Sequence, residues 1–181
     1  MFGLSISDTP AAPTDAVRSL VDVSNGLGDA FFSVAQRTLR TLLADSGLLR
    51  RLPSSDPSSF SRRLLYVDPV KRFGIWVLGW PPGFGTPIHN HHCSCTFGVY
   101  QGSIDEILYS IEPDDAAVES GRCRRDTGYV GGAPLEHGLI HQMLNPGSTP
   151  AITVHIYAYR PDRHEDSIDR CFLAPGYVRE T

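Results

Sequence analysis

The segment AITVHIYAY (residues 151–159) has two contrasting faces, and this contrast decides the fold that we expect. Alternate residues of a β-strand point to opposite sides. One side of this strand would be wholly apolar, whereas the other would present a hydroxyl, an imidazole and a phenol in a row, from Thr153, His155 and Tyr157. Lys or Glu would serve equally well on a face that only meets water. The segment therefore predicts a strand whose polar face lines a cavity inside a barrel.

Short apolar runs of the same kind fill the chain from Arg62 onward. Turn residues break them into RLLYV, FGIWVLGW, TPIHNHH, TFGVYQG, IDEILYSI, GYVGG, LIHQML and AITVHIYAY. Runs of this length with Gly, Pro and Asp between them are typical of an antiparallel all-β sandwich or barrel.

Two helices are expected ahead of the strands. The apolar residues of TDAVRSLVDVSNG (14–26) roughly follow one helical face, with Thr14 as a cap and Asn25-Gly26 as the stop. Those of DAFFSVAQRTLRTLLADSG (29–47) recur at helical spacing, and the Pro- and Ser-rich segment 51–60 predicts a linker.

The chain of 181 residues has the length of one domain. We expect an N-terminal helical segment (1–55), a β-barrel core (60–160) and a C-terminal tail (161–181). The mixed charges of RPDRHEDSIDR (160–170) predict a solvated surface segment there.

Composition argues against several classes of partner. The net charge is −4 and no basic run is present, which disfavours nucleic acid and anionic membranes. The start carries no signal-peptide pattern and no apolar stretch could span a bilayer, so we expect a cytoplasmic protein. Four cysteines are too few for a disulfide scaffold, and Cys93 and Cys95 are poorly placed to bond to each other.

The segment HNHHCSCTFG (89–98) concentrates candidate metal ligands. On a strand, His89 and His91 share a face at about 7 Å apart, close enough to converge on one ion, whereas His92 points away. Cys93 and Cys95 continue the same face and could also lie near the ion. A third ligand must come from another strand, and His141 in GLIHQMLNP is a candidate.

The spacing around these histidines resembles the two-part signature of the cupin superfamily, over roughly residues 60–160. The two parts read Gly83-x5-His89-x-His91-x3-Cys95-x6-Gly102 and Gly128-x5-Pro134-x3-Gly138-x2-His141-x3-Asn145. Two extra residues before Gly138 make His137 a competing ligand, but the offsets of Gly138 and Asn145 favour His141. The resemblance implies a double-stranded β-helix, or jelly-roll, barrel with a metal inside.

Cys95 stands where most metal-binding cupins have a glutamate ligand. Three neutral imidazoles leave the charge of a divalent ion uncompensated, which favours an anionic ligand from the substrate. With this cysteine, the segments 63–92 and 141–159 are similar to cysteine dioxygenase and its bacterial relatives, the mercaptopropionate and mercaptosuccinate dioxygenases. The similarity implies Fe(II) as cofactor, since zinc fits the ligands but lacks redox chemistry, and a small thiol and O2 as substrates.

The same resemblance implies roles for further residues. In that family the cysteine can form a thioether with the tyrosine of a Ser-x-His-x-Tyr strand, which here reads Thr153-x-His155-x-Tyr157. Tyr157, His155 and Cys95 would then serve catalysis, with Thr153 orienting the imidazole and Trp80 forming a wall of the pocket.

FSRRLL (60–65) aligns Arg62 with the arginine that binds the substrate carboxylate in cysteine dioxygenase. Relatives that act on mercaptopropionate have glutamine at that position, so Arg62 favours L-cysteine. The alternative is that Arg62 and Arg63 are two exposed cations on an edge strand.

Two other functional classes stay open at this point. One is a metal-binding cupin of another activity, such as an isomerase or a carbon-cleaving dioxygenase. The other is a non-catalytic cupin that binds a small ligand. Neither the particular thiol nor the oligomeric state follows from the sequence.

Overall fold

A computed structural model describes residues 15–24, 29–51, 56–113, 116–159 and 167–174. Two α-helices and a 3-10 turn precede the strands: α1 (Asp15–Val23), α2 (Asp29–Leu43) and η1 (Leu48–Arg51). A second 3-10 turn, η2 (Leu135–His137), lies between two strands. The strands are β1 (Ser61–Val67), β2 (Phe73–Trp80), β3 (Ile88–His91), β4 (Ser94–Gln101), β5 (Ser103–Ile111), β6 (Ala117–Asp126), β7 (Val130–Ala133), β8 (His141–Leu144), β9 (Ala151–Ala158) and β10 (Ile168–Phe172).

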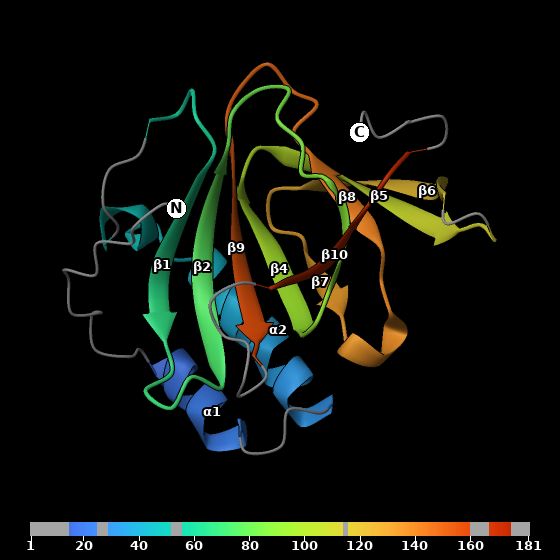
Figure 1. The fold of residues 1–181 in the computed structure, drawn as a ribbon. Helices are drawn as coiled ribbons and strands as arrows, with labels where there is room; N and C mark the ends of the chain where they lie inside the picture. Colours follow the sequence, from blue (N-terminus) through green and yellow to red (C-terminus); the bar gives the residue numbers. More distant parts are fainter. Residues whose placement is uncertain (1–14, 25–28, 52–55, 114–115, 160–166, 175–181) are drawn as a thin grey trace, which may run out of the picture.

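The strands form two five-stranded antiparallel sheets (Figure 1). One has the order β1-β2-β9-β4-β7 and the other the order β10-β3-β8-β5-β6. Strands far apart in the chain are neighbours in each sheet, as a jelly roll requires. The predicted all-β barrel preceded by helices is confirmed.

Strand β9 holds the centre of its sheet and has the two faces that its sequence predicts. Val154, Ile156 and Ala158 belong to a buried cluster that also contains Leu20 of α1 and Leu39 of α2. Helix α2 thus covers the outer face of this sheet, as Figure 1 shows, and α1 packs against α2. The opposite face of β9 points between the two sheets, where the cavity lies.

Two glycines allow close packing around β4. A Cβ on Gly98 would lie 2.8 Å from a methyl of Leu43, so the glycine lets α2 approach the sheet. A Cβ on Gly132, whose φ is +146°, would overlap the carbonyl oxygen of Cys95. Glycine is therefore required for β7 to pair with β4 beside Cys95.

The structure also contains elements that the sequence does not indicate. Strand β6 carries alternating exposed polar residues without an apolar run, and it is held by pairing with β5. Strand β10 lies in the region predicted as a solvated tail and pairs with β3. The predicted cap Thr14 and stop Asn25-Gly26 lie outside the described residues. None of the described helices is long and apolar enough to cross a membrane.

Candidate metal centre

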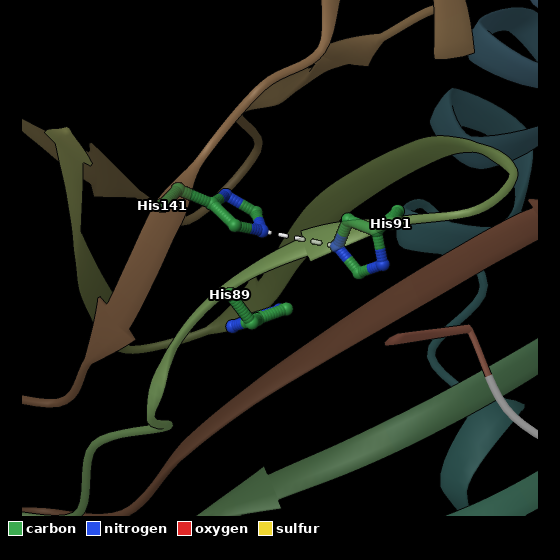
Figure 2. A group of neighbouring side chains, drawn as sticks. All are labelled: His89, His91 and His141. Carbon is green, nitrogen blue, oxygen red and sulfur yellow. Dashed lines mark hydrogen bonds between the residues drawn. The ribbon is translucent and has the colours of Figure 1, made fainter. Parts of the chain in front are cut away.

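Three histidines meet between the sheets (Figure 2). His89 and His91 project from β3, and His141 opens β8, where it pairs in register with His89. Their ligand atoms all lie within 4.8 Å of one another. Among the described residues, this is the group of side chains that could hold a metal ion, and it contains no carboxylate.

Each imidazole is oriented by an oxygen atom behind it. The Nδ1 atom of His89 is 2.8 Å from the carbonyl oxygen of Pro87, and that of His91 is 2.9 Å from the carbonyl oxygen of Ser167. The Nδ1 atom of His141 is 3.3 Å from Oε1 of Glu106. These oxygens only accept hydrogen bonds, so each Nδ1 carries the proton and each Nε2 keeps its lone pair.

The resulting arrangement fits a cation. The Nε2 atoms of His91 and His141 are 3.0 Å apart, the contact drawn dashed in Figure 2. A hydrogen bond between them would need a second proton on one ring. Burial and then the neighbouring histidine charges lower the pKa of His91 well below its ordinary value, which opposes that proton. Two nitrogens at ~2.1 Å from one ion and at right angles would be about 3 Å apart.

His89 is neutral for the same reason. Burial, followed by the charge of His141, lowers its pKa to about 4, while the hydrogen bond to Pro87 acts in the opposite direction. A neutral imidazole is the form that binds a metal.

Glu106 on β5 is a residue that the sequence reasoning missed. Its side chain is 4% exposed, and its Oε2 accepts two hydrogen bonds from Arg125, at 3.0 Å from Nε and 2.9 Å from Nη2. Its Oε1 faces His141. The signal was present in IDEILYSI, where an acidic residue shares a strand face with the buried Ile104. Glu106 therefore positions His141 from behind and is held by Arg125.

A cavity of about 370 Å³ opens over the three histidines. Most residues proposed from the sequence line it, namely Arg62, Trp80, His89, His91, Cys95, His141, His155 and Tyr157. Aromatic and apolar side chains that the sequence did not single out complete the wall, among them Phe60, Phe84 and Met143. The polar face of β9 thus faces a cavity.

Thr153 lies behind the cavity wall and links two of its members. The indole nitrogen of Trp80 donates to Thr153 Oγ1 at 2.8 Å, and this oxygen is 2.8 Å from Nε2 of His155. Because the indole is a donor only, the hydroxyl hydrogen of Thr153 remains for His155 Nε2. The proton of His155 then lies on Nδ1, which is 3.2 Å from the hydroxyl of Tyr157.

This network keeps His155 neutral and Tyr157 protonated. Burial, followed by the charges of His141, Arg62 and His89, lowers the pKa of His155 to about 3. Burial raises the pKa of Tyr157 well above its ordinary value. The phenol therefore enters the cavity as a neutral hydrogen-bond donor.

Cys95 lies opposite Tyr157 in the pairing of β4 with β9. Directly opposite residues of an antiparallel pair have their Cβ atoms about 5 Å apart, so the two side chains are neighbours. Burial raises the pKa of the Cys95 thiol well above its ordinary value, which keeps it protonated. Cys95, Cys93, Cys123 and Cys171 form no disulfide among the described residues.

Arg62 enters the cavity from β1. Its guanidinium carbon lies 4.1 Å from the ring centre of Trp76 and 5.6 Å from that of Tyr157. Its Nη2 atom is buried and has no hydrogen-bond partner among the described residues. Trp76 was missed in the sequence, and its indole nitrogen donates to Tyr159. His137, the competing ligand, is in η2 and stands outside the histidine cluster.

Two facing sheets around three convergent imidazoles form a fold of the cupin class with a candidate metal site. Residues 9–165 match the family profile described as cysteine dioxygenase type I. Because this match covers most of the sequence, the chain belongs to that family of iron-dependent thiol dioxygenases. The predicted family and the enzyme class are thereby confirmed. His89, His91 and His141 form a cluster that could bind a metal ion, as the family suggests.

Solved structures with similar folds include other barrels. The TT1209 protein from Thermus thermophilus has a TM-score of 0.46 and 19% identity, with 62% of this chain and 95% of that chain covered. A Cupin 2 conserved barrel domain protein from Salinispora arenicola has a TM-score of 0.45 and 17% identity, over 61% and 82%. An RmlC-like cupin family protein from Methanocaldococcus jannaschii has a TM-score of 0.47 and 14% identity, over 61% and 91%.

Replacing Glu106 by glutamine tests its role behind His141. The amide keeps the shape but removes the charge that strengthens the hydrogen bond to the ligand imidazole. We expect metal affinity to fall about 10- to 100-fold. A competition titration with a chelator measures this, and Glu119→Gln on the exposed part of β6 is the matched control. An unchanged affinity in Glu106→Gln, with the fold intact by circular dichroism, would contradict the assigned role.

Proposed function

We propose that the protein is a non-haem Fe(II) dioxygenase that adds both atoms of O2 to the sulfur of a small thiol carboxylate, with L-cysteine as the preferred substrate. The main support for this proposal is a cluster of three imidazoles without a carboxylate ligand that faces a cavity. The lining of this cavity contains a buried guanidinium nitrogen of Arg62 that has no hydrogen-bond partner among the described residues. Thiol and O2 combine to give a sulfinic acid, so sulfur loses four electrons, O2 gains them, and no external reductant is needed.

The ligand set favours an anionic substrate. His89, His91 and His141 contribute no negative charge, so a bound divalent ion keeps its full charge and stabilises a thiolate. Iron(II) held by these residues would supply a redox-active centre with open positions for both substrates. Cys95 is the alternative anion, but burial raises the pKa of its thiol and keeps it protonated.

Arg62 gives the substrate its orientation. A carboxylate enclosed in an apolar cavity needs a cationic partner, and guanidinium can bind both of its oxygens. The Nη2 atom of Arg62, a residue of the cavity lining, is a buried donor without a hydrogen-bond partner among the residues described. Trp76 fixes the guanidinium by lying under it.

Tyr157 holds the proton that the reaction can use. His155 donates from Nδ1 to the phenol oxygen, so the phenol hydrogen points to the other groups at the cavity. The side chains of Ser167 and Cys95 hydrogen-bond with Tyr157 there, and a bound substrate would compete for this hydrogen. Thr153 and Trp80 fix the imidazole in this tautomer. The phenol is thereby placed to donate to the substrate carboxylate or to oxygen beside the sulfur.

Oxygen consumption tests the proposed function directly. Protein purified without chelator should carry about one iron atom per chain and consume O2 with L-cysteine faster than with mercaptopropionate, mercaptosuccinate or N-acetylcysteine. His141→Ala should lose both iron and turnover, while His137→Ala should keep both because His137 lies outside the cluster. Normal iron and turnover in His141→Ala would refute the three-histidine assignment. If turnover is fastest with another thiol, that thiol and not cysteine is the preferred substrate.

Arg62→Ala tests the carboxylate partner. Loss of a charge-assisted hydrogen-bonded pair should raise KM for L-cysteine about 10- to 100-fold with a smaller change in kcat. Arg63→Ala is the control, because the next residue of β1 does not line the cavity. Steady-state oxygen uptake measures both. A KM within about twofold of the unmodified protein in Arg62→Ala would remove this role.

Intact mass spectrometry tests the proposed bond between Cys95 and Tyr157. Joining the sulfur to the phenol ring breaks one S–H and one C–H bond, and dioxygen accepts the two electrons and two protons. A fraction of molecules that have turned over should therefore weigh two hydrogen atoms less. Cys95→Ala should abolish this fraction and Cys93→Ala should retain it. An unchanged mass throughout would exclude the thioether.

A further inference from the structure

A second, smaller cavity adjoins the histidine cluster. It has three lining residues in common with the large cavity, His91, Cys95 and His141, and the rest of the two linings differ. These three side chains therefore separate the two spaces. The small cavity has a volume of about 20 Å³, which is enough for one small molecule.

The lining of the small cavity is mostly apolar. Phe97, Ala133 and Leu139 contribute hydrocarbon surface. Glu106 is the charged residue in the lining, but its Oε1 already faces His141 Nδ1 and its Oε2 accepts from Arg125. With the Nε2 atoms of His91 and His141 engaged by a metal ion, the rest of this lining favours an apolar molecule over ordered water.

The lining of the small cavity includes a residue at the protein surface. Leu135 in η2 is one of its lining residues and is 41% exposed. Ala133 lies opposite Cys95 in the pairing of β7 with β4, so the lining runs from a surface residue of η2 to the histidine cluster. The small cavity therefore borders His91 and His141 from a side that the rest of the large cavity's lining does not occupy.

We propose that this cavity is the access route and holding site for dioxygen. The inference depends on the proposed function, since it assumes that a thiol carboxylate fills the large cavity between Arg62 and the histidines. A thiol carboxylate bound there would block access to the histidines through the large cavity. Dioxygen is small and apolar, and it partitions into apolar spaces in preference to water. Separate approaches let dioxygen reach the cluster after the thiol has bound.

Xenon and oxygen kinetics test the cavity in two independent ways. Crystals of the purified full-length protein under xenon pressure should show an anomalous peak between Ala133, Leu139 and His141. In solution, Ala133→Val should remove much of the space and raise the KM for O2 about fivefold or more, with the KM for thiol unchanged. Leu139→Phe narrows the same space from another element and provides a second variant if the first does not fold.

Leu64→Phe is the matched control for Leu139→Phe. Leu64 lies on β1, is 40% exposed and lines neither cavity. The KM of the Leu64→Phe variant for O2 should therefore equal that of the unmodified protein. Absence of xenon from the cavity, or an unmoved KM for O2 in the folded filling variants, would overturn the inference. If the unmodified chain consumes no oxygen with any thiol, the proposed function is refuted instead. If its rate is normal but the KM for O2 is unchanged in the filling variants, only the dioxygen route is refuted.

Discussion

The pairing of β3 with β8 is the contact on which the site depends. It places His89 opposite His141, and the alternation within β3 adds His91 to the same side. Oxygen atoms of Pro87, Ser167 and Glu106 then accept hydrogen bonds from the three Nδ1 atoms. The lone pairs on the Nε2 atoms consequently point toward one another. Buried lone pairs at 3.0 Å repel unless a cation lies between them, so the fold itself creates the demand for an ion.

Strand β9 connects this centre to the rest of the molecule. One face packs with α1 and α2 in the main core, and the other carries Thr153, His155 and Tyr157 toward the cavity. The helices therefore stabilise the strand that orients the proposed proton donor. The three imidazoles are neutral and do not compensate the charge of a bound ion, so an anionic substrate would compensate it. The carboxylate of Glu106 lies behind His141 and orients this imidazole instead of belonging to the histidine cluster.

Sequence periodicity could predict the parts of the site that lie on single strands. The His-x-His pair of β3 and the alternating face of β9 needed only the two-residue repeat of a strand. The family resemblance supplied His141, Cys95 and Arg62. The partnership of Glu106 with Arg125 could not be predicted, because it depends on the register between β5 and β6. Strands β6 and β10 were missed because pairing, not apolar pattern, holds them, and the carbonyl of Ser167 orients His91 only through that pairing.

The central claim is that three imidazoles and no protein carboxylate hold one iron ion. Anomalous diffraction at the iron edge, from crystals of protein purified without chelator, tests it most directly. The account predicts a single peak at ~2.1 Å from the Nε2 atoms of His89, His91 and His141, with Glu106 still bound to Arg125. A peak coordinated by Glu106 or Cys95, or no peak among the three rings, would contradict it.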